Sequence, residues 1–117
     1  MNKRRFGAVG ERVAQKYMIN KGYRIITTNF YTQKGEIDII AVKDKIIVFV
    51  EVKTRSNNKF GTPAMAVNYK KKQHIKIAAK IYLMIHKLYQ NNVRFDVIEV
   101  VVNGNGYKIN HIKGIMC

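Results

Sequence analysis

The chain has 117 residues and a formal net charge of +15, because 22 Lys and Arg residues outnumber seven Asp and Glu residues. This length and a hydrophobic fraction of 47% predict one globular domain over residues 1–117 and exclude a disordered chain. The single cysteine, Cys117, excludes a disulfide framework and a cysteine-based zinc cluster, and it fits a reducing, cytoplasmic compartment. No apolar run approaches the roughly 20 residues that a membrane-spanning helix needs, so we expect no membrane segment.

The surplus of positive charge is large enough to attract phosphate polymers or anionic lipid, and nucleic acid is the partner that we expect. A compositional explanation stays open, because the chain is rich in Lys, Asn and Ile, as proteins are when a genome favours those codons. The charge alone therefore does not establish a nucleic-acid-binding function.

In chain order, the hydrophobic pattern predicts a first helix over residues 3–21, with Gly22 as its stop signal. β-Branched and aromatic residues then predict three strands, which we expect to form an antiparallel meander. These strands cover residues 23–30, 36–42 and 46–53. A turn at residues 33–35 separates the first two strands.

The second half of the chain predicts another helix and two more strands. Its elements are a polar loop over residues 54–62 ending at Pro63, a helix over 68–90 with Asn68 as N-cap, and strands over 94–102 and 107–112. A strand that follows a helical crossover is most simply placed parallel to its neighbour in the sheet. We therefore predict an α/β fold with a mixed central sheet flanked by helices, in the order αβββαββ.

Four of the seven acidic residues gather around the predicted meander. Glu11 lies on the first helix, Glu36 and Asp38 lie on the second strand, and Glu51 lies on the third. A basic chain has little reason to place acids in its most apolar stretch, because buried acids without partners are costly. A metal ion would supply the missing partner.

The length of the second turn decides whether these acids meet. A two-residue turn at positions 44–45 would set Asp38 directly opposite Glu51, and Glu36 opposite Lys53. The Cβ atoms of directly opposed residues lie about 4.5–5.5 Å apart, where like charges repel. Two carboxylates at that separation can bind one hard divalent cation such as Mg²⁺.

A metal at this position suits the cleavage of a phosphodiester. The transition state carries added negative charge, which a metal offsets while it also lowers the pKa of a water molecule. Lys53 would orient or deprotonate that water, or stabilise the transition state.

These residues resemble the active-site signature of the PD-(D/E)XK nuclease superfamily, with Asp38, then Glu51-Val52-Lys53, preceded by Glu11 on a helix. The predicted order of elements agrees with the restriction-endonuclease-like core of that superfamily. More closely, segments 35–41, 48–55 and 94–97 resemble the YraN-like, endonuclease-related family, over nearly the whole chain. Ile37 stands where the nominal motif of the superfamily has proline.

The resemblance implies a metal-dependent endonuclease that hydrolyses DNA phosphodiester bonds, with branched or otherwise structured DNA as one substrate class. It implies that Asp38 and Glu51 are metal ligands, that Lys53 is the catalytic lysine and that Glu11 assists at the metal. The metal would be Mg²⁺ or Mn²⁺, and the partner would be DNA in preference to RNA. A homodimer stays open, because two scissions need two sites.

Basic residues on both sides of the polar loop predict a groove for a nucleic-acid backbone. The candidates are Arg55, Lys70, Lys71, Lys72 and Gln73, of which Lys71 and Gln73 follow from the resemblance. Positive charge at a helix N-terminus opposes the macrodipole and calls for an anion such as phosphate. Asp96 and Glu99 are expected to support the sheet, and His111 is expected to be a surface or packing residue.

Two other functions stay open from the sequence. The first is a nucleic-acid-binding module that keeps the nuclease fold and cleaves little or nothing. The second is a small basic RNA-binding or ribosome-associated protein, in which the grouping of the four acids is accidental.

Overall fold

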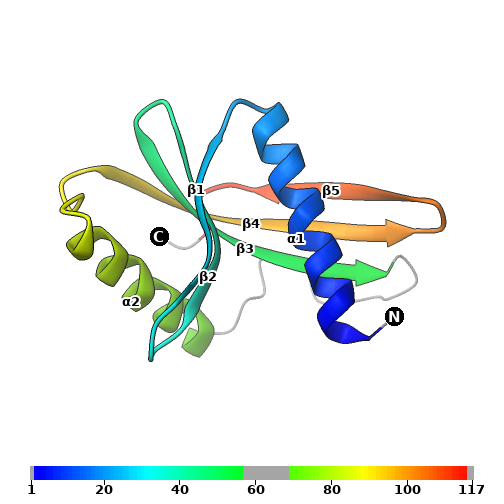
Figure 1. The fold of residues 1–117 in the computed structure, drawn as a ribbon, viewed down its shortest axis with the longest axis horizontal. Helices are drawn as coiled ribbons and strands as arrows, with labels where there is room; N and C mark the ends of the chain where they lie inside the picture. The colour runs from blue at the N-terminus through cyan, green and yellow to red at the C-terminus, as the bar shows by residue number, and fades with distance from the viewer. Residues whose placement is uncertain (1, 57–68, 116–117) are drawn as a thin grey trace.

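Two helices and five strands make up the fold within residues 2–56 and 69–115, which the computed structural model describes (Figure 1). In chain order they are α1 (Lys3–Asn20), β1 (Arg24–Tyr31), β2 (Glu36–Lys43), β3 (Ile46–Ser56), α2 (Tyr69–Ile85), β4 (Asn92–Asn103) and β5 (Gly106–Ile112). The mixed α/β class and the restriction-endonuclease-like order αβββαββ predicted from the sequence are confirmed.

The five strands form one sheet in the order β1-β2-β3-β4-β5. The first three strands are antiparallel, as predicted for a meander, and β4 and β5 are also antiparallel. β3 and β4 are parallel, because the chain crosses from one to the other through α2. The parallel placement of the strand after the second helix is therefore confirmed.

The two helices cover opposite faces of the sheet, because side chains alternate between the faces along each strand. On one face, Ala14 and Met18 of α1 pack with Val50 of β3. On the other face, Tyr82 of α2 packs with Phe49, the neighbour of Val50. All five side chains are at most 3% exposed, so the middle of the sheet is a buried layer. In the described residues, neither helix is long and apolar enough to cross a membrane.

The ends of α1 are those that the sequence predicts. The Asn2 side chain caps the helix by accepting a hydrogen bond from Arg5 N–H at 2.9 Å. At the other end, Gly22 has a φ of 94°, and Tyr23 N–H donates to the Met18 carbonyl at 3.0 Å. This is the left-handed glycine stop expected at position 22.

The end of α2 differs from the prediction, because the helix stops at Ile85 and not at residue 90. Lys87 takes the left-handed conformation with a φ of 55°, and Leu88 N–H donates to the Leu83 carbonyl at 2.7 Å. The hydrogen bonds are those of the glycine stop of α1, but a lysine occupies the left-handed position. The sequence therefore carries no glycine that would mark this end.

β3 is longer than predicted, because it continues through Thr54 to Ser56 where a polar loop was expected. Thr54 lies against α1 at Gly10, where an added Cβ would overlap the threonine hydroxyl. This close approach and the pairing with β4, which extends to Ser56 opposite Val102, keep these residues in the sheet. The rest of the predicted loop, Pro63 and the N-cap Asn68 lie outside the described residues.

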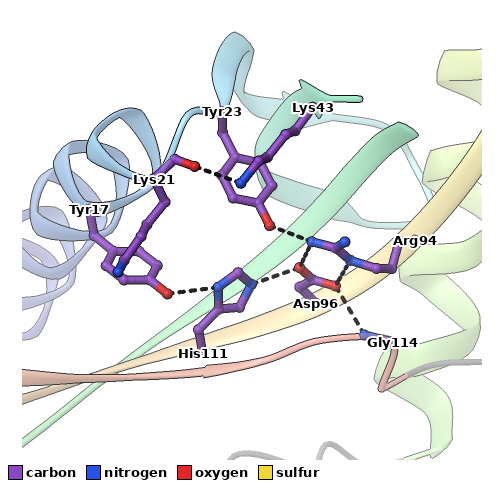
Figure 2. Close-up of polar contacts among 8 residues, drawn as sticks. All are labelled: Tyr17, Lys21, Tyr23, Lys43, Arg94, Asp96, His111 and Gly114. Atoms are coloured by element: carbon purple, nitrogen blue, oxygen red, sulfur yellow. Dashed lines mark hydrogen bonds and ion pairs between the residues drawn. The ribbon is translucent and has the colours of Figure 1, made fainter. Parts of the chain in front are cut away.

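A buried ionic network lies on the α1 side of β4 and links three parts of the chain (Figure 2). Asp96 is 0% exposed and accepts two hydrogen bonds from Arg94, at 2.9 and 2.8 Å. His111 Nε2 of β5 lies 2.7 Å from the same carboxylate, and Gly114 N–H donates to it at 3.1 Å. The network reaches α1, since the Tyr17 hydroxyl lies 3.0 Å from His111 Nδ1.

The network keeps Asp96 ionised. Burial alone would raise the pKa of Asp96, but the hydrogen bonds from His111, Arg94 and the Gly114 backbone outweigh burial and hold the pKa below its usual value. Asp96 thus has the supporting role in the sheet that the sequence suggests. His111 is not a surface residue, because its side chain is 5% exposed and bonded at both ring nitrogens.

Replacing Gly10 by alanine tests how closely α1 approaches the sheet. The new methyl group would overlap Thr54, so α1 must move, and we expect the free energy of unfolding to fall by about 1–3 kcal/mol. Gly7→Ala is the matched control on the same helix, because nothing lies within 4 Å of a Cβ at that position. The control should raise stability by up to about 1 kcal/mol through helix propensity. Urea unfolding measures both values, and equal effects would contradict the close packing.

Candidate active site

The turn between β2 and β3 sets the register of the site. Asp44 and Lys45 have φ values of 52° and 66°, the left-handed conformation that a two-residue type I′ turn requires. The ladder that starts at this turn runs as far as Ile39 opposite Val50. The two-residue turn on which the sequence argument depends is therefore confirmed.

β2 and β3 separate at the position of the predicted metal ligands. Figure 1 shows β2 turning away from β3 beyond their paired segment, while β3 continues beside β4. The Asp38 side chain bridges the separation, because its Oδ2 accepts a hydrogen bond from Val52 N–H at 2.8 Å. The paired ladder ends at Ile39 and Val50, so neither predicted pairing, Asp38 with Glu51 or Glu36 with Lys53, is part of it. On the other edge of β2, Glu36 pairs with Tyr31 of β1.

Asp38 and Glu51 nevertheless interact, because, besides burial, the charge of Asp38 and its side-chain hydrogen bonding both raise the pKa of Glu51. The two residues are 7% and 8% exposed. Burial, followed by the charge of Asp38, raises the pKa of Glu51 to about 8. Without a cation the pair therefore retains a proton at neutral pH.

Two lysines partly offset the negative charge of this pair. Lys71 Nζ of α2 lies 3.6 Å from Glu51 Oε2, and the lysine side chain is 43% exposed. Lys53 follows two positions after Glu51 on the same face of β3 and also lowers its pKa. The two lysines lower the pKa of Glu51 by less than burial and Asp38 together raise it. The structure thus brings Asp38, Glu51 and Lys53 together and adds Lys71 to them.

Glu11 reaches the same opening from α1. Burial, and then the charges of Asp38 and Glu36, raise the pKa of Glu11, while a hydrogen bond from the Asn29 side chain lowers it. Asn29 lies in β1 with a φ of 54°, and no motif in the sequence marks it as a functional residue. An asparagine inside a β-branched strand is the signal that could have found it, because asparagine adopts this conformation more readily than most residues.

The donor set fits a divalent cation held by few protein ligands. The described residues contain no group of three or more His, Cys, Asp or Glu side chains arranged as a metal site. Asp38 and Glu51 would therefore be the protein ligands, with water in the other positions, as is usual for Mg²⁺. Both supply hard oxygen donors, and burial and the charge of Asp38 disfavour the ionised form of Glu51. Glu11 lies beside Asp38 and would assist from there.

The residues predicted to contact nucleic acid differ in their exposure and in the ion pairs that they already form. Arg55 forms an ion pair with Glu99 at 2.7 Å, and Lys71 forms one with Glu51 at 3.6 Å. The other three candidates, Lys70, Lys72 and Gln73, lie at the start of α2, the first exposed and the others half-buried. A surface hollow follows β3 beyond the carboxyl pair and is lined by residues 52–55.

The fold and this site define an α/β protein whose sheet opens between two strands around a pair of buried carboxyl groups. The chain belongs to the uncharacterised protein family UPF0102, whose family model matches residues 10–100. It is 52% identical to a UPF0102 protein of Alkaliphilus oremlandii, over 97% of both chains. It is 48% identical to a UPF0102 protein of Caldicellulosiruptor bescii, over 97% of this chain and 98% of the relative. Membership of the YraN-like family, which segments of the sequence resemble, is therefore confirmed.

The raised pKa of Glu51 predicts how the stability of the metal-free protein varies with pH. The folded state keeps the Glu51 proton up to about pH 8, whereas an unfolded glutamate releases it near its ordinary pKa of 4.5. The unfolded state therefore binds fewer protons between these values, so the free energy of unfolding falls as the pH rises through this range. We expect a fall of roughly 2–4 kcal/mol, which Glu51→Gln should remove.

Urea unfolding in EDTA at a series of pH values measures the two profiles. Asp44→Asn is the control, because it removes an acid from the same hairpin and asparagine suits the turn conformation. Its profile should keep the fall that the wild type shows. Parallel profiles for wild type and Glu51→Gln would mean that Glu51 ionises as an ordinary surface acid.

Proposed function

We propose that this chain is a metal-dependent endonuclease that hydrolyses phosphodiester bonds in DNA, with branched or otherwise structured DNA as candidate substrates. The observation that carries the proposal is the buried pair of Asp38 and Glu51, in which double ionisation is unfavourable without a cation. A purely structural role gives little reason to retain such a pair, because buried charges are often replaceable by apolar residues at no loss of stability. Titratable groups whose pKa is shifted by burial and by a neighbouring charge cluster at functional sites.

Each residue of the opening has a role in this proposal. A divalent cation, when bound, would neutralise charge on the scissile phosphate and activate water. Asp38 and Glu51 would hold the cation, and the hydrogen bond from Val52 N–H keeps the Asp38 carboxylate in the opening. Lys53 would contact the phosphate or orient the attacking water. Glu11 would accept hydrogen bonds from water on the α1 side.

The charge and shape of the surface favour nucleic acid as the substrate class. A net charge of +15 attracts a phosphate backbone. The hollow lined by residues 52–55 includes Lys53, so a backbone lying in it would contact this lysine, two positions from Glu51. The resemblance to PD-(D/E)XK nucleases supports DNA over RNA, whereas the names of the relatives describe a family and no activity.

A cytoplasmic location, expected from the single cysteine, would give the protein access to DNA and Mg²⁺. A homodimer would supply the two sites that are needed to cut both strands of a duplex together.

A nucleic-acid-binding module with the same fold is the second candidate function. The Lys71–Glu51 ion pair favours it, because a lysine already compensates part of the charge that a cation would neutralise. The lack of a third acidic ligand in contact with the pair, within the described residues, points the same way. The third candidate, a small basic RNA-binding protein, leaves the buried acids without a purpose.

Cleavage assays with matched variants test the endonuclease directly. Purified protein with Mn²⁺ or Mg²⁺ should nick supercoiled and branched DNA, and EDTA should stop the reaction. Asp38→Ala and Lys53→Ala should each lower the rate by about 100-fold or more, because they remove a cation ligand and a transition-state contact. Both variants should bind the same DNA at low salt nearly as the wild type does, since the rest of the basic surface is unchanged.

Asp44→Asn serves again as the control and should cleave at the wild-type rate. Inactivity of wild type and variants over a broad panel of substrates would favour the binding module. Equal cleavage by wild type, Asp38→Ala and Lys53→Ala would remove the two residues from the site.

Calorimetric titration with Mn²⁺ tests the carboxyl pair without any assay of activity. The wild type should bind Mn²⁺ more tightly as the pH rises through about 8, because Glu51 must release its proton to act as a ligand. Asp38→Asn and Glu51→Gln should each remove this binding. Binding that is the same in both variants as in the wild type would make the acid grouping accidental, as the third candidate requires.

A further inference from the structure

A second hollow lies between the outer side of α1 and the start of β5, and we call it the α1–β5 groove. Figure 1 shows α1 crossing in front of β4 and β5. The residues that line the groove include Val9, Arg12, Val13, Lys16, Ile19 and Tyr107. None of these residues belongs to the carboxyl site described above.

The α1–β5 groove is mainly apolar although it faces water. Ile19 and Tyr107 are 57% and 55% exposed, and Val9 and Val13 are half-buried. Large apolar side chains that gather in one exposed hollow mark a binding surface more often than scattered ones do. A ligand for this groove must therefore present flat or apolar surface.

Basic side chains border the apolar floor. Arg12 and Lys16 are four residues apart on α1, so they lie on one side of the helix, and both are exposed. Neither forms an ion pair within the described parts of the chain. Arg5 extends the row, because it lies about two turns before Arg12 and lines an adjoining hollow with it.

The acids of the protein do not neutralise this row. Glu11 is the sole acid of α1, and it lies beside Asp38 and Glu36 at the other site. Asp96, on the sheet beneath α1, is bonded to Arg94 and His111. The groove therefore combines an apolar floor with cations whose charge is available to an anionic partner.

We propose that the α1–β5 groove binds a single-stranded segment of nucleic acid, and the choice of ligand class rests on the proposed function. Phosphates would contact Arg12 and Lys16, while a base would stack on the Tyr107 ring and others would cover the valines of the floor. Stacking on an aromatic ring beside a basic row is how proteins bind single strands with little dependence on sequence. Branched and structured DNA contains such unpaired segments.

Other occupants match the groove less well. A duplex keeps the faces of its bases stacked inside, so it would satisfy the cations and leave the apolar floor uncovered. A second copy of the chain carries the same charge of +15, and it would bring like charges together. An acidic segment of a partner protein would match the charge of the groove, but it offers no base to stack on the Tyr107 ring. A peptide of this kind is included in the test.

Fluorescence anisotropy with labelled oligothymidylate and oligoadenylate in EDTA tests the groove, since the proposed cleavage cannot occur there. Arg12→Gln/Lys16→Gln should weaken binding about tenfold or more and reduce the log–log salt slope by about 1.4, because two phosphate contacts are lost. Lys45→Gln/Lys80→Gln is the matched control, because it removes two charges from exposed lysines elsewhere. The control should weaken binding far less.

Tyr107 supplies a test that does not involve charge. Tyr107→Ala should lower the affinity about 5- to 150-fold, because a base loses its stacking partner, while Tyr107→Phe should bind as the wild type does. The side chain is 55% exposed, so its removal should leave the core intact, and circular dichroism checks this.

Equal losses in the groove and control variants would overturn the proposal, because they would show attraction by net charge alone. A duplex of the same length that binds as tightly as the single strands, with the same dependence on Tyr107, would also overturn it. So would a Glu- and Leu-rich peptide that binds the groove when the oligonucleotides do not. Asp38→Ala should bind the oligonucleotides as the wild type does. An inactive carboxyl site and an inactive groove therefore give separate results.

Discussion

The two-residue turn between β2 and β3 is the constraint on which the candidate active site depends. It holds Asp38 and Glu51 in a register that brings their carboxyl groups together, and a shift of one residue would move one of them to the other face of the sheet. Past the paired segment, the Asp38 side chain accepts the Val52 N–H and the strands part. Both helices can then contribute to one opening, α1 through Glu11 and α2 through Lys71.

The protein buries acids in two places and compensates them differently. Asp96 receives hydrogen bonds from Arg94, His111 and a backbone N–H, which keep its pKa low and its charge satisfied. Asp38 and Glu51 face each other, and burial leaves one of them protonated at neutral pH. Full compensation is what stability requires of a buried acid. The incompletely compensated pair is therefore the better candidate for a binding site.

Local patterns in the sequence predict the order of the elements, the tight turn and the meeting of the two acids, because hydrophobic period and turn residues act over a few positions. They do not predict the end of α2 at Ile85, because Lys87 takes the left-handed conformation that is usually marked by glycine. They also miss the parting of β2 from β3, since β3 follows β4, a strand distant in the sequence. The interaction of Asn29 with Glu11 and the bonds of His111 to Asp96 and Tyr17 also join residues that are far apart in the sequence.

The connectivity of the sheet also has a consequence for the order of folding. The hairpin of β2 and β3 is local and can close within microseconds, whereas β3 and β4 become neighbours only after the chain has crossed over through α2. We expect the two acids to meet while both are still hydrated, and to lose their water when α2 docks with Lys71. The unfavourable burial then belongs to a late step. A cation bound between the acids would consequently slow unfolding more than it would speed folding.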